Sequence, residues 1–372
     1  MARAEKRSVS RAGNRRRVIA PGGLLLAGSL AVAGCSSNSS KPGAHASAGG
    51  AGSAGSSTSS PSAVATASGS AGPVTAASLS DSRLGYTVNA RARSLRAARS
   101  DVVALLVPDV RNTFFAQLAH TVQAALFTRG LTTIIGSASE DAEQQDGYLR
   151  VLLEQRIDGV ILAPQGDATP GLRTLVERRI PLVLVDRTIT ALNVPSIDSD
   201  PAPGLHAAVE ELVDHGHRSV TYVAGLLGSS TGRERLAAFE QAAASSLAHG
   251  SARVIRAEST GAQWLDELDE HLRTGTTALV LSYSPHTLMA IRHLQDTGRR
   301  FGRDVSIISY DDLEVFDLLR PRLTVITQHP VRQAERAVDM LCEAIDGGRP
   351  ASERIAASLI RRDSVATLAP QP

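Results

Sequence analysis

From Val102 onward, short apolar runs alternate regularly with longer amphipathic stretches, and this alternation limits the folds open to the chain. Continuous apolar runs of strand length are typical of parallel sheets that helices cover on both faces. The predicted strands are Val102–Val107, Thr132–Gly136, Gly159–Ala163, Leu182–Val185, Val220–Ala224, Val254–Ala257, Ala278–Ser282, Val305–Tyr310 and Leu323–Thr327. The predicted helices are Phe115–Arg129, Ala142–Gln155, Gly171–Arg179, Pro203–His215, Arg233–Ala248, Trp264–Arg273, Pro285–Thr297 and Val331–Asp346. About eleven strands over about 270 residues exceed a typical α/β unit, so the pattern predicts two sheets in two lobes.

The charge balance and the low aromatic content argue against a surface built for nucleic acid or membrane. The chain has 39 basic and 37 acidic residues, and only 3% of its residues are aromatic. Such a balance gives no overall attraction to polyanions, and single-strand binders need many aromatic stacking platforms. The two cysteines, Cys35 and Cys342, form neither a disulfide framework nor a metal-ligand pattern. We expect Cys342 to be a small buried hydrophobe, and we expect no cofactor and no metal.

Residues 1–35 have the layout of a secretory signal peptide. A basic opening precedes an apolar stretch, Val18–Ala33, which is shorter than the ~20 residues of a stable membrane span. Its end, Val32-Ala33-Gly34-Cys35, resembles the bacterial lipobox, with Val32 where leucine is commoner. The resemblance implies acylation of Cys35 and anchoring to the outer face of the membrane. The alternative is an ordinary apolar segment that ends in Gly-Cys.

Residues 36–80 are dominated by Ser, Ala and Gly, and they predict a disordered linker because they bury too little surface to offset chain entropy. Residues 81–100 contain Leu84-Gly85-Tyr86, Asn89 and Ala92-Arg93-Ser94-Leu95. This segment resembles the hinge of LacI/GalR-type repressors, in which the leucine matched by Leu95 enters the minor groove. Residues 36–80 hold no helix-turn-helix pattern. We therefore interpret residues 81–100 as a hinge remnant, with a plain surface helix as the alternative, and expect no specific DNA binding.

Six further motifs resemble the sensor core of the same LacI/GalR family across residues 101–365. They are Pro108–Phe115, Ile157–Ile161, Ile180–Arg187, Arg235–Phe239, Val305–Asp312 and Leu323–Gln328. The resemblance implies an α/β type I periplasmic-binding-protein fold, with two Rossmann-like lobes, parallel sheets flanked by helices and a ligand cleft between the lobes. It assigns residues 101–199 and 329–348 to the N-terminal lobe. Residues 200–328 and 349–365 are assigned to the C-terminal lobe.

The candidate ligand residues follow predicted strands, where open parallel sheets bind their ligands. Carboxylates, amides and guanidinium groups suit a hydroxyl-rich ligand, and a phenylalanine can offer an aromatic face. The resemblance implies that Arg235 reaches the ligand from the second lobe. The predicted ligand-binding residues are Asn112, Phe114, Phe115, Asp186, Arg187, Asp198, Arg235, Asp311 and Gln328. As alternatives, an aspartate after a strand can cap the next helix, and one of the two phenylalanines can belong to the core.

The sequence departs from the family pattern at two places. Tyr283-Ser284 stands where the family has Asn-Asp, which removes an amide and a carboxylate from the pocket wall, and Ala238 stands where the family has Gly. The first departure predicts a ligand less hydroxylated than a pyranose, with degraded binding as the alternative. We expect His286 to be solvated or to cap a helix. The glycine-rich segment Gly225–Gly232 is interpreted as a loop at the rim of the cleft, with a phosphate cradle as the alternative.

Two functional classes follow, and neither is an enzyme, because no G-x-S-x-G, Walker or H-E-x-x-H motif occurs. The first is a lipid-anchored, extracytoplasmic protein that binds a small polar metabolite such as a sugar and serves an ABC-type permease or a membrane sensor. The alternative is a cytoplasmic LacI/GalR-type transcriptional regulator whose DNA-binding head is missing. A homodimer is compatible with both classes.

Overall fold

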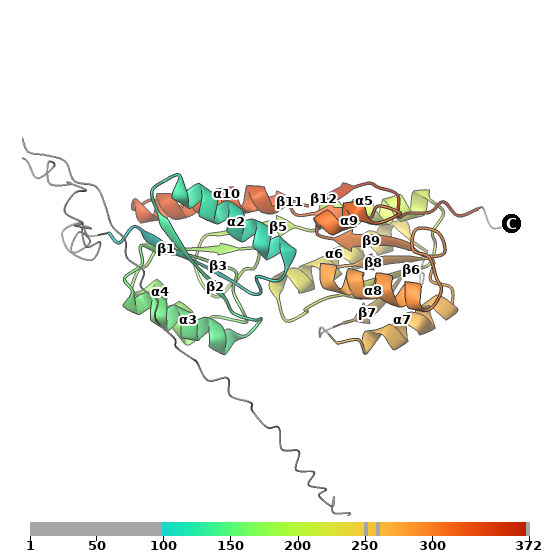
Figure 1. The fold of residues 1–372 in the computed structure, drawn as a ribbon, viewed down its shortest axis with the longest axis horizontal. Coiled ribbons are helices and arrows are strands. Elements are labelled where there is room, and N and C mark those ends of the chain that lie inside the picture. Colours follow the sequence, from blue (N-terminus) through green and yellow to red (C-terminus); the bar gives the residue numbers. More distant parts are fainter. Residues whose placement is uncertain (1–98, 249–251, 258–260, 370–372) are drawn as a thin grey trace, which may run out of the picture. The chain divides into compact units, whose positions relative to one another are not determined.

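Two six-stranded sheets make up the part of the chain that the computed structural model describes, residues 99–248, 252–257 and 261–369 (Figure 1). The first sheet has the order β11-β5-β4-β3-β1-β2, and the second has the order β12-β10-β9-β8-β6-β7. The strands of the first sheet are β1 Val102–Val107, β2 Thr132–Ser137, β3 Gly159–Leu162, β4 Leu182–Val185, β5 Ser196–Asp200 and β11 Glu353–Ala356. Those of the second are β6 Val220–Ala224, β7 Ala252–Arg256, β8 Ala278–Leu281, β9 Ser306–Tyr310, β10 Thr324–Thr327 and β12 Ser358–Ile360. The prediction of two α/β lobes is confirmed.

Helices cover both faces of each sheet. In the first lobe they are α2 Thr113–Phe127, α3 Ala142–Glu154, α4 Pro170–Glu177 and α10 Pro330–Ile345. In the second lobe they are α5 Ala202–Asp214, α6 Ser230–Ser246, α7 Trp264–Arg273, α8 Ser284–Asp296 and α9 Glu314–Leu318. Strand β1 shows why its sequence is apolar at nearly every position. Val103 and Leu105 pack toward α2 and α10, whereas Ala104 and Leu106 pack toward α3 and α4. A strand with water on one face would alternate with polar residues instead.

Four elements of the structure were not predicted, because their sequences are polar or very short. Strand β5 reads Ser-Ile-Asp-Ser-Asp, β11 reads Glu-Arg-Ile-Ala, β12 has three residues and α9 has five. Strand β11 also pairs in parallel with β5 in the first sheet. Residues 353–356 therefore do not lie in the second lobe, to which residues 349–365 were assigned. The reason is that β11 forms backbone hydrogen bonds with β5 at the edge of the first sheet. The remaining lobe boundaries stay a prediction.

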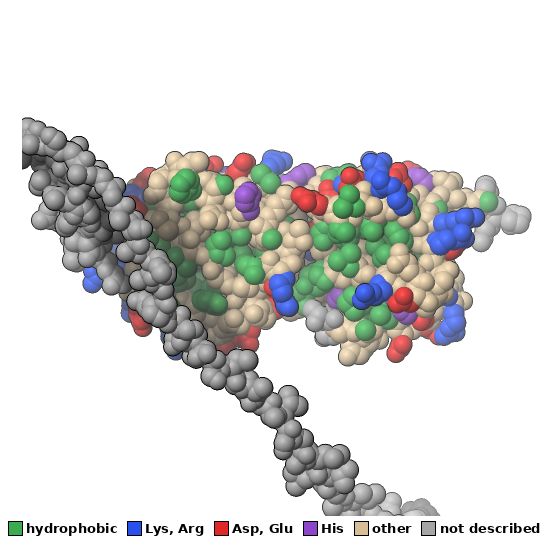
Figure 2. All heavy atoms as spheres, in the orientation of Figure 1, with side chains coloured by type: hydrophobic (Ala, Val, Ile, Leu, Met, Phe, Trp, Pro, Cys, Tyr) green, Lys and Arg blue, Asp and Glu red, His purple; other side chains and the backbone are tan. Residues whose placement is uncertain are grey.

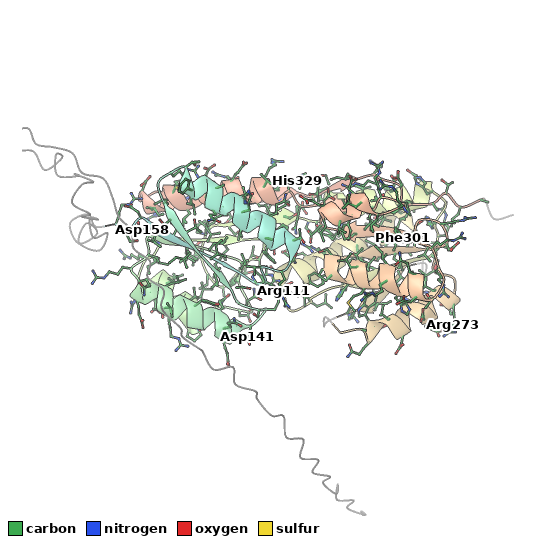
Figure 3. The ribbon with its side chains drawn as sticks, viewed as in Figure 1. Arg111, Asp141, Asp158, Arg273, Phe301 and His329 are labelled. Atoms are coloured by element: carbon green, nitrogen blue, oxygen red, sulfur yellow. The ribbon has the colours of Figure 1, made fainter. Side chains whose placement is uncertain are left out.

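The chain passes between the lobes after β5, after β10 and between β11 and β12. These three crossovers are bonded to one another. The Ala357 backbone N–H donates to the Asp200 carbonyl at 2.9 Å, and His329 Nε2 lies 3.0 Å from Ser358 Oγ. His329, labelled in Figure 3 where the lobes meet, has a left-handed φ of 56°. A short, linked junction of this kind suits hinge motion of one lobe against the other.

Several predictions concern residues outside the described part of the chain. They are the signal peptide 1–35 with Cys35, the linker 36–80 and nearly all of the hinge remnant 81–100. Within the described ranges, none of the helices combines the length and the apolar character needed to cross a bilayer.

Candidate functional site

A cavity lies between the lobes at the carboxyl ends of the strands. The first lobe contributes Asn112, Phe114, Phe115, Asp186 and Arg187. The second contributes Gly225, Leu226, Ser229, Thr231, Gly232, Arg235, Ser282, Tyr283 and Asp311, and Gln328 comes from the crossover after β10. We call this the interlobe cavity. Its volume is about 30 Å³, enough for a water or two but far below the ~300 Å³ or more of an open ligand pocket. The lobes are therefore closed upon one another, and a ligand needs them to part.

Two aspartates occupy equivalent places in the two lobes. Asp186 follows β4 and Asp311 follows β9, and each backbone N–H donates to the neighbouring strand, at 3.0 Å to Ile197 and 2.9 Å to Ile326. Both residues have left-handed φ angles, 64° and 67°, which cost energy for a residue with a side chain. Both carboxylates are buried. Strained, buried carboxylates at matching strand ends are typical of a binding site rather than of a stabilising element.

Burial dominates the electrostatics of these carboxylates. It raises the pKa of Asp186 to about 6, although Arg235 and then Arg187 favour the ionised form. Burial also raises the pKa of Asp311, against the pull of Arg235 and a hydrogen bond from Gln328. Among the described residues, Asp186 Oδ1 has no hydrogen-bond partner. An acceptor left unpaired in a buried site is ready for a donor from a ligand.

Arg235 on α6 is fixed by the second lobe. Its Nη1 donates to the Ser282 carbonyl at 2.9 Å, and its Nη2 donates to Gln328 Oε1 at 3.1 Å. The guanidinium carbon also lies 3.8 Å from the ring centroid of Tyr310, a cation–π contact. Gln328 Nε2 in turn donates to Asp311 Oδ1 at 2.7 Å. Three of the predicted residues thus form one hydrogen-bonded chain, Arg235–Gln328–Asp311.

Arg187 is held by a partner that the sequence did not point to. It makes a bidentate ion pair with Glu140, at 2.7 and 2.9 Å, and its Nη1 also donates to Gln165 Oε1 at 2.8 Å. Glu140 lies in the loop between β2 and α3, outside every motif that carried the family resemblance. This arrangement orients the arginine at the first-lobe wall, 5.9 Å from the Phe115 ring centroid.

Asn112, Phe114 and Phe115 line the cavity but also have structural roles. Asn112 caps α2, since its Oδ1 accepts from the Phe114 backbone N–H at 3.0 Å. The two phenyl rings meet edge to face at 5.0 Å and belong to the first-lobe core. The alternative that one phenylalanine is a core residue applies to both of them, and little aromatic surface is left for a ligand.

Asp198 is the predicted ligand residue that does not line the interlobe cavity. It lies on β5, and its Oδ2 is 2.9 Å from Arg354 Nε on β11. Arg354 also reaches Glu234 of α6 in the second lobe at 2.5 Å. Burial raises the pKa of Asp198 to about 6, against the charge of Arg354. The carboxylate therefore belongs to an ion-pair cluster that joins the lobes.

The second-lobe wall contains residues that were not predicted as ligand residues. Tyr283 stands beside Gly225, and the loop from Gly225 to Gly232 does rim the cavity. The expectation for His286 is wrong. It is fully buried in α8, and its ring lies 5.4 Å from that of Trp264, because the helix turns it into the second-lobe core.

The described residues offer no metal centre, since no group of three or more His, Cys, Asp or Glu side chains within them is arranged to hold an ion. Cys342 is a free thiol that is half-buried against the first-lobe core, and burial raises its pKa. It packs as a small apolar side chain but is less enclosed than expected.

Two parallel-sheet lobes with a polar cavity at their strand ends define a two-lobed ligand-binding domain of the type I periplasmic-binding-protein class. Residues 209–365 match the model of a "Periplasmic binding protein-like domain". The chain is 30% identical over 269 residues to the HTH-type transcriptional repressor PurR of Aliivibrio fischeri (strain MJ11), covering 70% of this chain and 80% of that protein. The chain therefore belongs to the LacI/GalR family, through a periplasmic-binding-protein-like effector domain.

Solved structures agree with this assignment. A probable LacI family transcriptional regulator from Corynebacterium glutamicum is 31% identical, with a TM-score of 0.65, over 72% of this chain and 100% of that one. A putative ribose operon repressor from Burkholderia thailandensis is 30% identical, with a TM-score of 0.62, over 70% of this chain and 99% of that one. These relatives are transcriptional regulators rather than enzymes. The domain is accordingly a small-molecule effector-binding domain and not an enzyme.

Proposed function

We propose that the domain binds a small hydroxyl-rich metabolite, a sugar or a related polar compound, in the interlobe cavity, and that the bound ligand holds the two lobes closed. Eight of the nine predicted ligand residues line this one cavity, although the chain separates Asn112 from Gln328 by more than half its length. That convergence is the observation that carries the proposal. The similarity to a putative ribose operon repressor from Burkholderia thailandensis supports the sugar class.

The chemistry of the cavity supports a ligand with several hydroxyl groups. Asp186 and Asp311 accept hydrogen bonds, whereas Arg235 donates, and the charges come from opposite lobes. A neutral polyol bonded to both lobes holds them together without leaving an uncompensated charge behind. Partial neutralisation of two carboxylates by two arginines also favours a neutral ligand over a strongly charged one.

Family membership favours a transcriptional regulator over an extracytoplasmic binding protein with a permease or membrane sensor as partner. The export hypothesis rests on residues 1–35, and the expectation of no specific DNA binding rests on residues 36–100. Fractionation of cells that express the tagged chain separates the two classes. A regulator stays in the cytosol, whereas an anchored protein moves to the membrane fraction and loses that location in Cys35→Ala.

A thermal-shift screen tests ligand binding itself. We expect at least one pentose, hexose, polyol or nucleoside to raise the melting temperature by roughly 5 °C or more at a hundredfold excess over its Kd. The matched control is Asp311→Ala, which should lose most of the shift while its unliganded melting temperature stays close to that of the wild type. The proposal fails if no compound of these classes shifts the melt.

A further inference from the structure

Tyr283 is the one described aromatic residue that the second lobe places in the wall of the interlobe cavity. It follows β8, and it is the N-cap residue of α8, yet its side chain makes no capping hydrogen bond. The side chain therefore lines the cavity without stabilising the helix end through a hydrogen bond. Its position therefore calls for a reason other than helix stability.

A glycine makes room for the Tyr283 side chain. Gly225 follows β6, the strand next to β8, and a Cβ at this position would lie only 2.8 Å from Tyr283 Cβ. Real Cβ atoms do not approach one another so closely, so a larger residue at 225 would displace the tyrosine. The absence of a side chain at Gly225 thus makes room for the bulky ring of Tyr283.

The ring is also supported from behind. Tyr283 meets His286 edge to face, with centroids 5.0 Å apart and planes at 82°, and His286 packs on Trp264. Every residue of this row belongs to the second lobe. When the lobes part, the ring moves with Arg235 and Asp311 and keeps its place in the wall.

Tyr283 lines the interlobe cavity together with Asp186 and Arg187 of the first lobe. Burial raises the pKa of Tyr283, and the charges of Glu140 and Asp109 raise it further. Arg111, which pairs with Asp109 at 2.8 Å, lies where the first lobe meets the second (Figure 3). The phenol therefore shares one cavity wall with predicted ligand residues of both lobes.

We propose that Tyr283 determines ligand specificity by limiting the size of the ligand. The inference rests on the proposed function and narrows it to compact polar ligands, because the fixed ring occupies volume at the second-lobe wall that a larger ligand would need. A small side chain at position 283 would leave the volume of the ring free for a larger ligand.

The test compares the melting temperatures of the wild type, Tyr283→Ala and Tyr283→Phe with erythritol, ribose, xylitol, glucose and maltose. The wild type and Tyr283→Phe should respond to the smaller probes alone. Tyr283→Ala should also respond to glucose or maltose, with an affinity for the larger probe that rises by about tenfold or more. Tyr148→Ala, a tyrosine of α3 outside the cavity, is the matched control and should keep the wild-type size limit.

Each remaining outcome decides against the inference. If the wild type binds maltose as tightly as ribose, or if Tyr283→Ala keeps the wild-type size limit, Tyr283 does not set ligand size. If Tyr283→Ala loses affinity for every probe equally, the ring stacks on the ligand instead of excluding larger ones. If none of the proteins binds any probe, the proposed function fails, and the size limit fails with it.

Discussion

The two aspartates at the strand ends differ from the other predicted ligand residues, because nothing in the fold of the domain requires them to be charged. Asn112 caps a helix and the two phenylalanines fill the core, so a purely structural role explains their presence. Asp186 and Asp311 combine burial, a left-handed backbone and raised pKa values. Their cost to folding supports the proposal that they bind the ligand.

The sequence located these aspartates because each follows an apolar run, and the strand direction brings such positions to one edge. It did not locate Glu140, which lies in a loop without apolar pattern and reaches Arg187 only in the folded chain. It placed Asp198 with the others for the same strand-end reason. Asp198 differs from Asp186 because it forms an ion pair with Arg354 of β11 instead of lining the cavity. The sequence does not reveal this pair, since Arg354 is remote from Asp198 along the chain.

At the residue scale we predict that Asp186→Asn changes how stability depends on pH. The folded pKa of about 6 lies above the ordinary value of 3.8, so the folded state binds more protons than the unfolded state between about pH 4 and 6. The stability of the wild type should therefore fall as pH rises through this window, by on the order of 3 kcal/mol from Asp186 alone. Asp198, with a similar pKa, contributes in the same direction.

Urea denaturation at pH 4.5 and pH 7 measures this effect. Asp186→Asn should be more stable than the wild type at pH 7, and this advantage should be much smaller at pH 4.5, because the amide carries no buried charge. An equal difference between the two proteins at both pH values would show that the carboxylate does not titrate in this range.

At the element scale, the first turns of α6 join the lobes. Ser230 Oγ accepts from the Thr188 backbone N–H of the first lobe at 3.0 Å, Glu234 pairs with Arg354, and Arg235 enters the cavity. One helix end therefore carries both the predicted ligand arginine, Arg235, and two direct contacts between the lobes. We therefore expect ligand contacts at this end of α6 to be coupled to closure of the lobes.

The elements that position this helix follow from the sequence to different degrees. Buried strands such as β1 and β8 are visible because both of their faces are apolar. Strands β5 and β11 are not, because they lie at or next to the sheet edge and carry Asp198 and Arg354 for the ion-pair cluster. A polar strand that serves an interlobe contact lacks the pattern by which buried strands are recognised.

We predict that Glu234→Gln favours the open arrangement of the lobes. The change removes the charge that Arg354 meets across the junction but leaves the cavity residues intact. Small-angle X-ray scattering of the unliganded protein should give a larger radius of gyration for Glu234→Gln than for the wild type. Glu240→Gln, an exposed position on the same helix, is the control and should scatter like the wild type. Identical scattering of all three proteins would exclude the interlobe role of Glu234.

At the scale of the whole molecule, two neighbouring helices of the second lobe expose apolar side chains. Leu288 of α8 and Val315 and Leu318 of α9 are exposed, Leu318 by 75%. Figure 2 shows hydrophobic surface over these elements. Apolar surface of this kind favours an interface, and we propose that it supports the homodimer that the sequence left open.

The corresponding prediction is that Leu318→Arg weakens self-association without unfolding the domain. A charge in the centre of an apolar interface is desolvated without a partner, so the dimer should dissociate at least about tenfold more readily. Sedimentation equilibrium of the wild type, Leu318→Arg and the exposed first-lobe control Phe127→Arg measures this. A wild type that is monomeric at every concentration, or a dimer insensitive to Leu318→Arg, would refute the proposal.

The central claim is that Asp186 and Asp311 hold one ligand between the two lobes. Isothermal titration calorimetry tests this claim most directly. The measurement uses the compound with the largest thermal shift and compares the wild type with Asp186→Ala, Asp311→Ala and Asp198→Ala. Loss of a charged hydrogen bond costs about 1–3 kcal/mol, so the first two variants should bind roughly ten- to a hundredfold more weakly. Asp198→Ala, whose carboxylate lies outside the cavity, should stay within a few-fold of the wild type. Wild-type affinity in both Asp186→Ala and Asp311→Ala would contradict the account and place the ligand elsewhere.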